Sequence, residues 1–278
     1  MKKNKMVAPV VKWVGGKRQL LDELTPLFPN KFSTYCEPFV GGGAVLFNRQ
    51  PSTAYINDAN GELINVYEVI RDNVEELISS LQQHKNESEY FYKIRDLDRD
   101  HEAFEKLSNI ERASRMLFLN KTCFNGLFRV NNAGEFNSPF GNYKNPNIVN
   151  APTLLAVNRY FNEAKIHISN VDYSEVLQKI PKGSFVYLDP PYDPVSATSS
   201  FTGYTRGGFG RDEQIRLREC CDELDSRGIK FMLSNSATDF IKEQYNAYDI
   251  KIVKAKRAIN SVASKRGDVD EVVIRNYE

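Results

Sequence analysis

Four residues that directly follow a short apolar run could do chemistry on an amine. The run covers residues 185–188 and predicts a buried strand, and Asp189, Pro190, Pro191 and Tyr192 come next. In open α/β sheets, ligands bind at the carboxyl ends of strands. The two prolines fix an extended turn, so Asp189 offers a carboxylate acceptor, Pro190 a carbonyl acceptor and Tyr192 an aromatic face. Two acceptors match the two N–H bonds of an exocyclic amine, and the face matches the ring that carries it; the alternative is a proline-rich surface loop.

A glycine-rich turn follows an earlier predicted strand. Phe39 and Val40 precede Gly41, Gly42 and Gly43, a composition that lets a ligand approach the backbone closely. The turn is neither the six-position dinucleotide fingerprint nor a P-loop, because no Gly-Lys-Ser/Thr follows it. A tight structural turn remains the alternative interpretation.

An acidic residue ends the next predicted strand. Asp58 lies 15 residues after Gly43, somewhat closer than the usual spacing of the carboxylate that holds a ribose in nucleotide-binding α/β folds. An Asp in this place can also cap the following helix. The glycine turn and Asp58 together favour a nucleotide-like ligand.

Two further stretches have residue types that suit a ligand. Lys12, Trp13 and Lys17 surround a Gly pair and could contact an anionic or aromatic group, although Trp13 could equally be a core residue. Residues 120–144 interleave aromatic, amide and basic side chains. Arg can read guanine, Asn can read adenine and an apolar side chain can enter the base stack, so this stretch suits DNA; a packed loop is the alternative.

The charge of the chain is balanced overall but uneven locally. The 278 residues contain 37 Lys and Arg against 36 Asp and Glu, which excludes a wholly basic binder of the histone kind. Residues 1–21 and residues 251–267 each contain six basic residues and no acidic one, whereas residues 71–110 contain ten acidic and six basic residues. Charge alone favours separate solvated runs.

The cysteines and the apolar runs limit the class of protein. Cys36, Cys123, Cys220 and Cys221 match no zinc spacing, and a chain of this size needs no disulfides. With three His as well, we expect no metal site. No run resembles a signal-peptide core or the roughly 20 apolar residues of a membrane span, so we expect a protein of a reducing compartment that does not contact membranes.

The elements that must position these residues alternate along the chain. Strands are predicted at residues 33–38, 54–58, 166–172, 185–189, 230–235, 250–256 and 272–277, and helices at residues 18–28, 61–71 and 211–226. This order indicates an α/β fold with a mostly parallel sheet and a final antiparallel hairpin at its edge. Helical patterns at residues 74–84, 90–100 and 110–121 interrupt the alternation, so we predict a sheet domain at 1–70 and 165–278 with a mainly helical insert at 71–164.

Taken in order, the motifs resemble those of the Dam group of N6-adenine DNA methyltransferases. The resemblance runs from about Val11 to Tyr277 and rests on seven stretches: Lys-Trp-x-Gly-Gly-Lys, Glu-Pro-Phe-Val-Gly-Gly-Gly, Asn-Asp-x-Asn, Phe-Asn-Gly-Leu-x-Arg, Pro-Phe-Gly-x-Tyr-Lys, Asp-Pro-Pro-Tyr and Ser-x-Thr-x-x-Phe-Thr. The group includes methylases of GATC-specific restriction–modification systems. The Asp-Pro-Pro-Tyr tetrad alone indicates only the wider class, whereas the ordered set is specific.

The resemblance implies a Rossmann-like sheet that binds S-adenosylmethionine, releases S-adenosylhomocysteine and needs no metal, with the insert as target-recognition domain. Asp189, Pro190 and Tyr192 would be catalytic, with the adenine flipped out of duplex DNA and its amine held by Asp189 and the Pro190 carbonyl. The cofactor would be held by a set of residues from both ends of the sheet domain: Trp13, Lys17, Phe39, Gly41, Gly43, Asp58, Asp172 and Asp189.

The resemblance also assigns residues to DNA. The predicted contacts are Lys12 on the outer guanine, Phe124 as a wedge, and a group of neighbours: Asn125, Leu127, Arg129, Pro139 and Tyr143. Asn142 departs from the pattern, because many relatives have Arg there. The basic ends and the recognition loop are expected to converge on one DNA-facing side, with the acidic stretch away from it.

Two other functions remain open at this stage. The same tetrad suits N4-cytosine methylation, and a DNA-binding regulator with an inactive cofactor fold would contain the same insert. We expect a monomeric, cytoplasmic protein encoded by a prokaryote or a phage.

Overall fold

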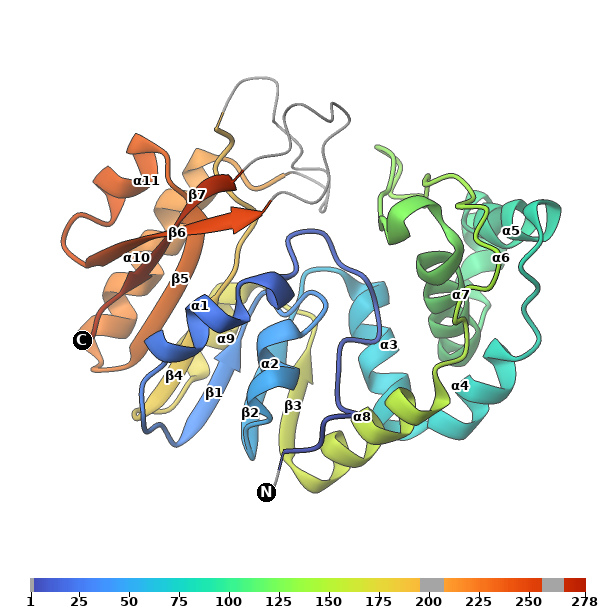
Figure 1. Cartoon of the computed structure of the whole chain (residues 1–278), viewed down its shortest axis with the longest axis horizontal. Coiled ribbons are helices and arrows are strands. Elements are labelled where there is room, and N and C mark those ends of the chain that lie inside the picture. The colour runs from blue at the N-terminus through green and yellow to red at the C-terminus, as the bar shows by residue number, and fades with distance from the viewer. Residues whose placement is uncertain (1–2, 196–207, 257–267) are drawn as a thin grey trace.

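The computed structural model describes residues 3–195, 208–256 and 268–278 of the chain (Figure 1). In this part the strands form one seven-stranded sheet in the order β3-β2-β1-β4-β5-β7-β6. Their bounds are β1 (Thr34–Glu37), β2 (Thr53–Asn57), β3 (Lys165–Ser169), β4 (Ser184–Leu188), β5 (Lys230–Ser236), β6 (Asp249–Lys256) and β7 (Asp268–Arg275). All seven strand predictions are confirmed, with ends that differ by a few residues.

The direction of the strands creates a switch point in the middle of the sheet. Strands β1 to β5 are parallel to one another, and β1 pairs with β2 on one side and with β4 on the other. The chain therefore proceeds outward from β1 in one direction and from β4 in the other. The carboxyl ends of β1 and β4 flank the crevice where open α/β sheets bind ligands.

The last two strands form the predicted antiparallel hairpin. Strand β7 pairs with β5 and with β6, so β6 is the edge strand. The register places Glu271 opposite Ser236 of β5 and opposite Val253 of β6. The hairpin therefore brings Glu271, near the start of β7, next to the carboxyl end of β5.

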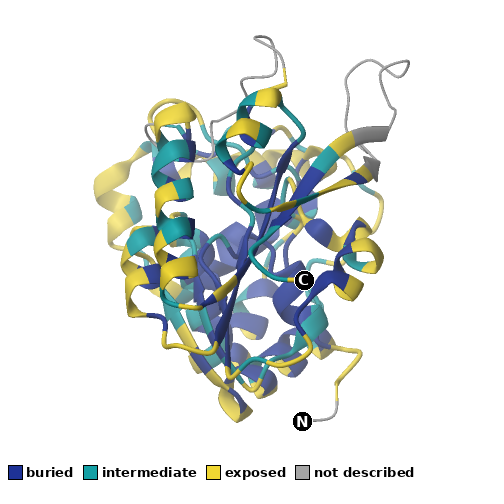
Figure 2. Cartoon of the chain, turned by 90° about the vertical axis from the view of Figure 1, so that its left-hand side faces the viewer, coloured by how far each residue is buried: buried dark blue, intermediate teal, exposed yellow. Residues whose placement is uncertain are grey.

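Strand residues alternate between two cores, one on each face of the sheet. Tyr35 and Phe185 face a core that includes the N-terminal segment and the helices α2 (Ala44–Arg49), α3 (Gly61–Asp72) and α8 (Ala151–Glu163). Cys36 and Val186, one position later, face helices α9 (Tyr173–Lys179), α10 (Arg211–Ser226) and α11 (Asp239–Gln244). Because side chains of a strand alternate in direction, an apolar strand can serve both cores. Figure 2 shows the buried centre between the two layers.

The prediction of a single helix at residues 18–28 is wrong. The segment forms a 3₁₀ turn η1 (Lys17–Gln19), a single helical turn α1 (Leu21–Leu24) and a second 3₁₀ turn η2 (Thr25–Leu27). Pro26 has no N–H for an α-helical hydrogen bond, and the chain continues at Thr25 as a 3₁₀ turn instead. Leu20, Leu24 and Leu27 are nevertheless buried, as the apolar pattern indicated.

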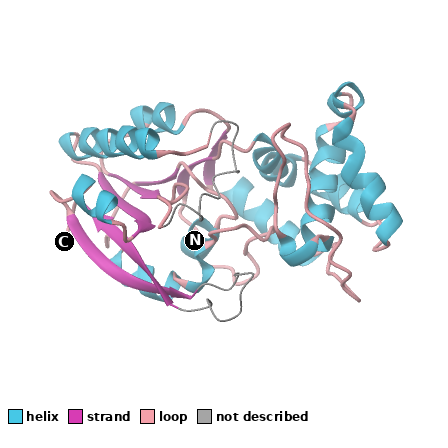
Figure 3. Cartoon of the chain, turned by 90° about the horizontal axis from the view of Figure 1, so that it is seen from above, coloured by secondary structure: helices cyan, strands magenta, loops and turns pink. Residues whose placement is uncertain are grey.

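A helical region lies between β2 and β3 along the chain. Besides α3 and α8 it contains α4 (Val74–Leu81), α5 (Ser88–Arg95), η3 (Asp96–Arg99), α6 (His101–Glu105), α7 (Asn109–Thr122) and η4 (Phe124–Gly126). The helices predicted at 74–84 and 110–121 are confirmed as α4 and α7, the second with a Ser108–Glu111 capping box. The pattern at 90–100 divides into α5 and η3. Figures 1 and 3 show α4 to α7 beside the sheet, with α3 and α8 nearer to it.

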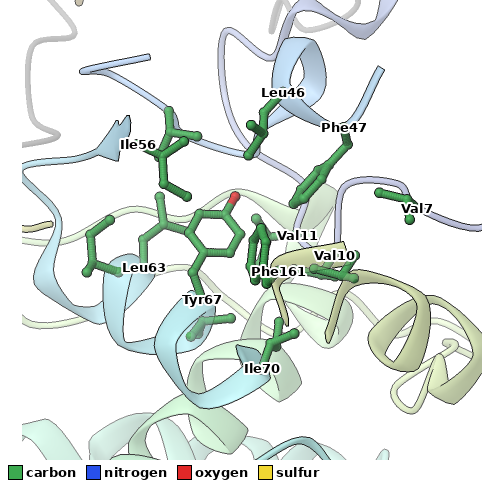
Figure 4. Close-up of a cluster of buried hydrophobic side chains, with 14 of the residues drawn as sticks. Val7, Val10, Val11, Leu46, Phe47, Ile56, Leu63, Tyr67, Ile70 and Phe161 are labelled. Atoms are coloured by element: carbon green, nitrogen blue, oxygen red, sulfur yellow. The ribbon is translucent and has the colours of Figure 1, made fainter. Parts of the chain in front are cut away.

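The N-terminal segment joins the sheet region to the helical region. Asn4 and Gln50 exchange hydrogen bonds of 2.9 Å, and Val7, Val10 and Val11 are buried. Figure 4 shows these valines near Phe47 of α2, Tyr67 and Ile70 of α3, and Phe161 of α8. These contacts with α2, α3 and α8 fix the position of the N-terminal segment directly before residues 12–17.

Two findings bear on the expected class of protein. All four cysteines are free thiols. In the described part of the chain, no helix has the length and apolarity needed to cross a bilayer.

Candidate active site

A buried cation contacts the predicted catalytic tetrad. The Nζ atom of Lys17 lies 2.8 Å from Oδ1 of Asp189 and 4.7 Å from the ring centroid of Tyr192, and Lys17 is only 5% exposed. Lys17 also donates a 2.7 Å hydrogen bond to the Gly15 carbonyl. Residues 15–17 precede β1 in sequence, but these contacts place them in the same site as the end of β4.

The environment of Asp189 makes its carboxyl group a weaker acid than usual. Burial raises the pKa of Asp189 to about 6, with Glu271 adding to the rise and the Lys17 charge and hydrogen bond opposing it. A carboxylate in this range is ionised at neutral pH and can accept hydrogen bonds there. Its protonated form becomes abundant only below pH 6.

A second carboxyl group lies beneath the site. Glu37, the last residue of β1, accepts a 2.8 Å hydrogen bond from the Tyr35 hydroxyl and a 3.1 Å bond from the Leu46 N–H. Burial raises the pKa of Glu37 to about 8, and Asp189 contributes to the rise. Glu37 is therefore mostly neutral at pH 7, which leaves Asp189 as the ionised carboxylate of this pair.

The loop after β4 is held by two buried amides. Gln214 of α10 donates a 2.8 Å hydrogen bond to the Pro191 carbonyl, and Asn235 of β5 accepts a 3.1 Å bond from the Asp193 N–H. The two amides are themselves joined at 3.0 Å. Within the described residues no donor contacts the Pro190 carbonyl, so this oxygen can accept a hydrogen bond from a bound molecule.

The glycine turn between β1 and α2 is a close-packed cradle. Gly41 (φ +47°) and Gly43 (φ +69°) have left-handed backbone, and a Cβ at either position would lie 2.7 Å from Trp13 or Phe47. The Gly41 carbonyl accepts a 2.6 Å hydrogen bond from the Tyr67 hydroxyl, which reaches the turn from α3 among the apolar side chains of Figure 4. The turn therefore requires glycine for its own conformation as well as for any ligand.

Asp58 contacts the glycine turn and does not cap α3. Its carboxylate accepts hydrogen bonds of 2.9 Å from the N–H groups of Gly41 and Asn60, whereas the side chain of Asn60 caps the helix. Burial raises the pKa of Asp58, and the two backbone donors oppose this rise. Asp58 thus lies beside the turn after β1, as expected for a residue that completes a nucleotide site.

A buried amide joins the turns after three strands. Asn57 donates to the carbonyls of Pro38, after β1, and of Val171, after β3, at 3.2 and 3.0 Å. The side-chain oxygen Oδ1 of Asn57 accepts a 3.0 Å hydrogen bond from the Val171 N–H. Asn57 therefore holds the carboxyl ends of β1, β2 and β3 together, a role that the sequence analysis did not assign.

Two other predicted cofactor residues have protein partners. Asp172 caps α9 by accepting from the Ser174 N–H at 2.9 Å, and it pairs with Arg216 at 2.6 Å. Hydrogen bonds from Arg216 and Ser174 lower the pKa of Asp172 although burial opposes the shift. The Phe39 ring packs against Tyr173 with a centroid distance of 5.1 Å. Both residues lie near the switch point.

The predicted DNA-contacting residues gather after the end of α7. Phe124 is 54% exposed, and its N–H donates a 2.8 Å hydrogen bond to the carbonyl of Pro139, which is also exposed. Asn125 is exposed in left-handed backbone (φ +58°). The segments 122–124 and 139–141 run side by side, so residues from two parts of the predicted interface form one surface.

The remaining members of this set are partly buried or paired. Leu127 and Tyr143 are half-buried, and Nζ of the exposed Lys12 lies 5.5 Å from the Tyr143 ring centroid. Arg129 donates hydrogen bonds to the side chain and carbonyl of Asn137 at 2.7 and 3.2 Å. Asn142, where the family pattern has Arg, is exposed with φ +51°.

The surface that is predicted to contact DNA is hydrogen-bonded to residues 12–17. Asn120 of α7 and the backbone of Lys12 exchange two hydrogen bonds of 2.8 Å, and Asn120 also donates to the Gly126 carbonyl. The rings of Trp13 and Phe128 stack with a centroid distance of 5.1 Å. Trp13 therefore lies between the glycine turn and the helical region, and four residues of chain separate Lys12 from Lys17.

Parts of the predictions lie outside the described residues. These are the Ser-x-Thr-x-x-Phe-Thr stretch at 196–202 and most of the basic run at 251–267, whose described members Lys251 and Lys254 are exposed on β6. Lys17, a predicted cofactor residue within the basic N-terminal run, is buried against Asp189 and adds nothing to the exposed charge of that run. Among the described residues, no group of three His, Cys, Asp or Glu side chains could hold a metal ion.

Several residues of the site carry no clear signal in the sequence. Gln214, Asn235 and Glu271 lie in a helix and two strands that are defined by their apolar neighbours. The polar identity of Asn235 inside the strand predicted at 230–235 could have marked that residue, whereas Glu271 lies directly before the strand predicted at 272–277. Their partners in the tetrad loop are distant in sequence, and the strand order β4-β5-β7 brings them together.

The chain matches known methyltransferases along almost its full length. Residues 13–259 match the family model of the D12 class N6 adenine-specific DNA methyltransferases. The type II methyltransferase M1.LlaDCHI of Lactococcus lactis subsp. cremoris is 43% identical over 280 residues, which cover 100% of this chain and 98% of the relative. The type II methyltransferase M.MjaIII of Methanocaldococcus jannaschii is 41% identical over 295 residues, covering 98% and 99%.

A third relative carries the group name expected from the motifs. The DNA adenine methylase of Escherichia coli (strain K12) is 34% identical over 288 residues, which cover 98% of this chain and 95% of the relative. These matches favour adenine over cytosine as the target base and an enzyme over an inactive regulator. The chain belongs to the D12 class of N6 adenine-specific DNA methyltransferases.

Proposed function

We propose that the protein transfers a methyl group from S-adenosylmethionine to N6 of an adenine flipped out of duplex DNA, within the sequence GATC. The observation that carries the proposal is the arrangement after β4, where the Asp189 carboxylate, the Pro190 carbonyl, which accepts no hydrogen bond from the described residues, and the Tyr192 ring lie across the switch point from the glycine turn. Family membership supports adenine in DNA as the substrate.

The residues present fit the cofactor. Asp58 offers a carboxylate beside the glycine turn after β1, in the place where nucleotide-binding α/β folds hold a ribose. Trp13 and Phe39 add aromatic surface on either side of this turn. When bound, S-adenosylmethionine supplies a methyl group on a positively charged sulfur.

The chemistry assigned to the chain is orientation of the amine. Asp189 and the Pro190 carbonyl accept the two N6 hydrogens, which directs the nitrogen lone pair toward the methyl group, and Tyr192 stacks on the base. Holding the reacting atoms in line converts a bimolecular step into one of much lower entropic cost. No covalent intermediate with the enzyme is part of this mechanism.

Lys17 has to exchange its partner during this reaction. Its ammonium pairs with the carboxylate oxygen that the amine needs and lies near the face of the ring on which the base stacks. Binding of adenine therefore displaces Lys17 from Oδ1 of Asp189. The ammonium keeps Asp189 charge-compensated until the amine arrives.

Recognition is assigned to the surface after α7. Lys12 contacts the outer guanine, the exposed Phe124 enters the base stack, and the neighbours already described contact the duplex: Asn125, Leu127, Arg129, Pro139 and Tyr143. The domain division at residues 71–164 follows from this assignment. We further propose that the enzyme acts as a monomer in the cytoplasm, in line with its bacterial and archaeal relatives.

The test uses unmethylated plasmid, the purified protein and S-adenosylmethionine. After incubation, DNA should resist a nuclease that N6 methylation blocks at GATC and remain sensitive to one that ignores it. Mass spectrometry of the nucleosides should show N6-methyladenine and no N4-methylcytosine. Continued cutting at GATC with methylated adenine elsewhere would refute the site, and near-normal turnover of Asp189→Ala would refute the catalytic assignment.

A further inference from the structure

A carboxylate from the last strand holds the outer end of the tetrad tyrosine. The Tyr192 hydroxyl donates a 2.7 Å hydrogen bond to Oε2 of Glu271, and both side chains are half-buried. Glu271 lies on β7, opposite Ser236 of β5. The contact therefore joins the loop after β4 to the antiparallel hairpin, across the intervening strand β5.

The hydrogen bond fixes a ring that is otherwise held at one end. The backbone at Tyr192 follows two prolines and is anchored through Pro191 by Gln214. A hydrogen bond at the hydroxyl fixes the first side-chain torsion of Tyr192, which sets where the ring lies. The hydroxyl oxygen lies on the axis of the second torsion, so the bond restrains the ring plane only through the preference of the phenol O–H to lie in that plane. Lys17 lies 4.7 Å from the ring centroid and also contacts Asp189 and the Gly15 carbonyl, so the ring lies beside the cation that pairs with Asp189.

A carboxylate suits this task better than a neutral acceptor. A hydrogen bond from a hydroxyl to an ionised carboxylate is shorter and about twice as strong as one between neutral groups. Burial together with Asp189 and Glu271 raises the pKa of Tyr192, so the phenol keeps its proton and remains the donor. The direction of the bond is therefore unambiguous.

We propose that Glu271 is a positioning residue for methyl transfer: its hydrogen bond holds the Tyr192 ring in the orientation on which the flipped adenine stacks beside Asp189. The inference rests on the proposed function, because it assumes that Tyr192 contacts the base. Glu271 acts through Tyr192 and touches neither substrate nor cofactor.

The experiment is a double-mutant cycle on the full-length protein with methyl-free genomic DNA. The variants are Glu271→Ala, Glu271→Gln, Tyr192→Phe and the double variant Glu271→Ala/Tyr192→Phe. Single-turnover methylation with saturating S-adenosylmethionine gives the rate, and separate assays give the KM for the cofactor and the Kd for DNA. The matched control is Asp270→Ala, an exposed acid one position earlier on the same strand.

The positioning role predicts a specific pattern. Glu271→Ala and Tyr192→Phe should each slow the single-turnover rate about ten-fold, since a small misplacement of a reacting group has effects of this order or larger. The double variant should be no slower than the slower single variant. Glu271→Gln keeps an acceptor and should recover most of the rate, and Asp270→Ala should match the parent. The KM for the cofactor should stay within about two-fold.

Two results would overturn the inference. One is a full rate for Tyr192→Phe, which removes only the hydroxyl and leaves β7 intact, so this variant decides the question even where Glu271→Ala lowers the melting temperature. The other is a double variant with multiplied defects, which would show that Glu271 acts independently of Tyr192.

Tyr192→Ala separates this inference from the proposed function. A slow Tyr192→Ala with parental rates for Tyr192→Phe and Glu271→Ala contradicts the inference alone. A parental rate for Tyr192→Ala shows that the ring does not contribute to methyl transfer, and it contradicts both.

Discussion

Lys17 and Asp189 form an ion pair of 2.8 Å in which the lysine is almost fully buried. The two residues are far apart in the sequence, since Lys17 precedes β1 and Asp189 follows β4. The pair explains how a carboxylate can be kept ionised in an apolar setting at neutral pH. It also means that the carboxylate proposed to accept the substrate amine has its charge compensated by Lys17 in the absence of DNA.

The first prediction concerns the pH dependence of methylation. Ionised Asp189 is the stronger acceptor for an N–H bond, and its pKa is raised by burial to about 6. We expect kcat/KM to be constant above this pH and to fall as pH drops through it, because protonation weakens the acceptor and turns one carboxyl oxygen into a donor. The measurement is the steady-state rate of DNA methylation between about pH 5 and 8 at constant salt concentration, a range that includes the midpoint near pH 6. A flat profile down to pH 5 would contradict it.

The second prediction concerns Lys17→Met. The methionine keeps the length and apolar stem of the side chain but removes the charge that lowers the pKa of Asp189. The acid limb of the kcat/KM profile should therefore move to higher pH, so that the variant loses more activity at pH 6 than at pH 8. Lys12→Met, which changes an exposed lysine nearby, is the control and should leave the midpoint unchanged. A profile that moves to lower pH would show that the ion pair is not kept in solution.

The third prediction concerns Phe128→Ala, a change in the helical region that should weaken cofactor binding. Phe128 stacks on Trp13, and Trp13 contacts the glycine turn. Loss of a buried Phe destabilises a protein by about 3 to 5 kcal/mol, so calorimetric binding is compared with Phe91→Ala, an equally buried ring of the same region. Only Phe128→Ala should reduce the affinity for S-adenosylmethionine. Equal losses in both variants would point to general destabilisation.

The fourth prediction concerns Phe124→Ala. Because the ring is exposed, its removal should change the free energy of unfolding by less than about 0.5 kcal/mol. The methylation rate should nevertheless fall, since the wedge no longer assists extrusion of the adenine. Fluorescence of 2-aminopurine at the target position measures extrusion directly. Leu155→Ala, an exposed apolar side chain on α8, is the control and should leave both readouts at the parental level.

The fifth prediction concerns salt. The basic residues near Lys12 and on β6 are expected to contact phosphates, so DNA affinity should fall steeply as salt rises, with a slope near −0.9 for each phosphate contact in a double-logarithmic plot. Titrations between about 50 and 200 mM salt measure the slope. A slope near zero would show that the basic runs do not contact phosphates and are separate solvated surfaces.

The sequence by itself determined which chemistry is available and at which end of the sheet it lies. Apolar runs with a strand-like length located β1 to β7, and the chemical residues Asp58 and Asp189 follow such runs directly. Because parallel strands place their carboxyl ends together, these local patterns were sufficient to predict one site. Local periodicity was insufficient at residues 18–28, where Pro26 interrupts hydrogen bonding without changing the apolar pattern.

Only the tertiary structure decided which side chains are partners. The strand order brings Glu271 of β7 to Tyr192, and the docking of residues 12–17 brings Lys17 to Asp189. Asn120 likewise joins the recognition surface to Lys12. Such pairs are formed by residues far apart along the chain, so their geometry depends on topology and packing, and no spacing in the sequence encodes it.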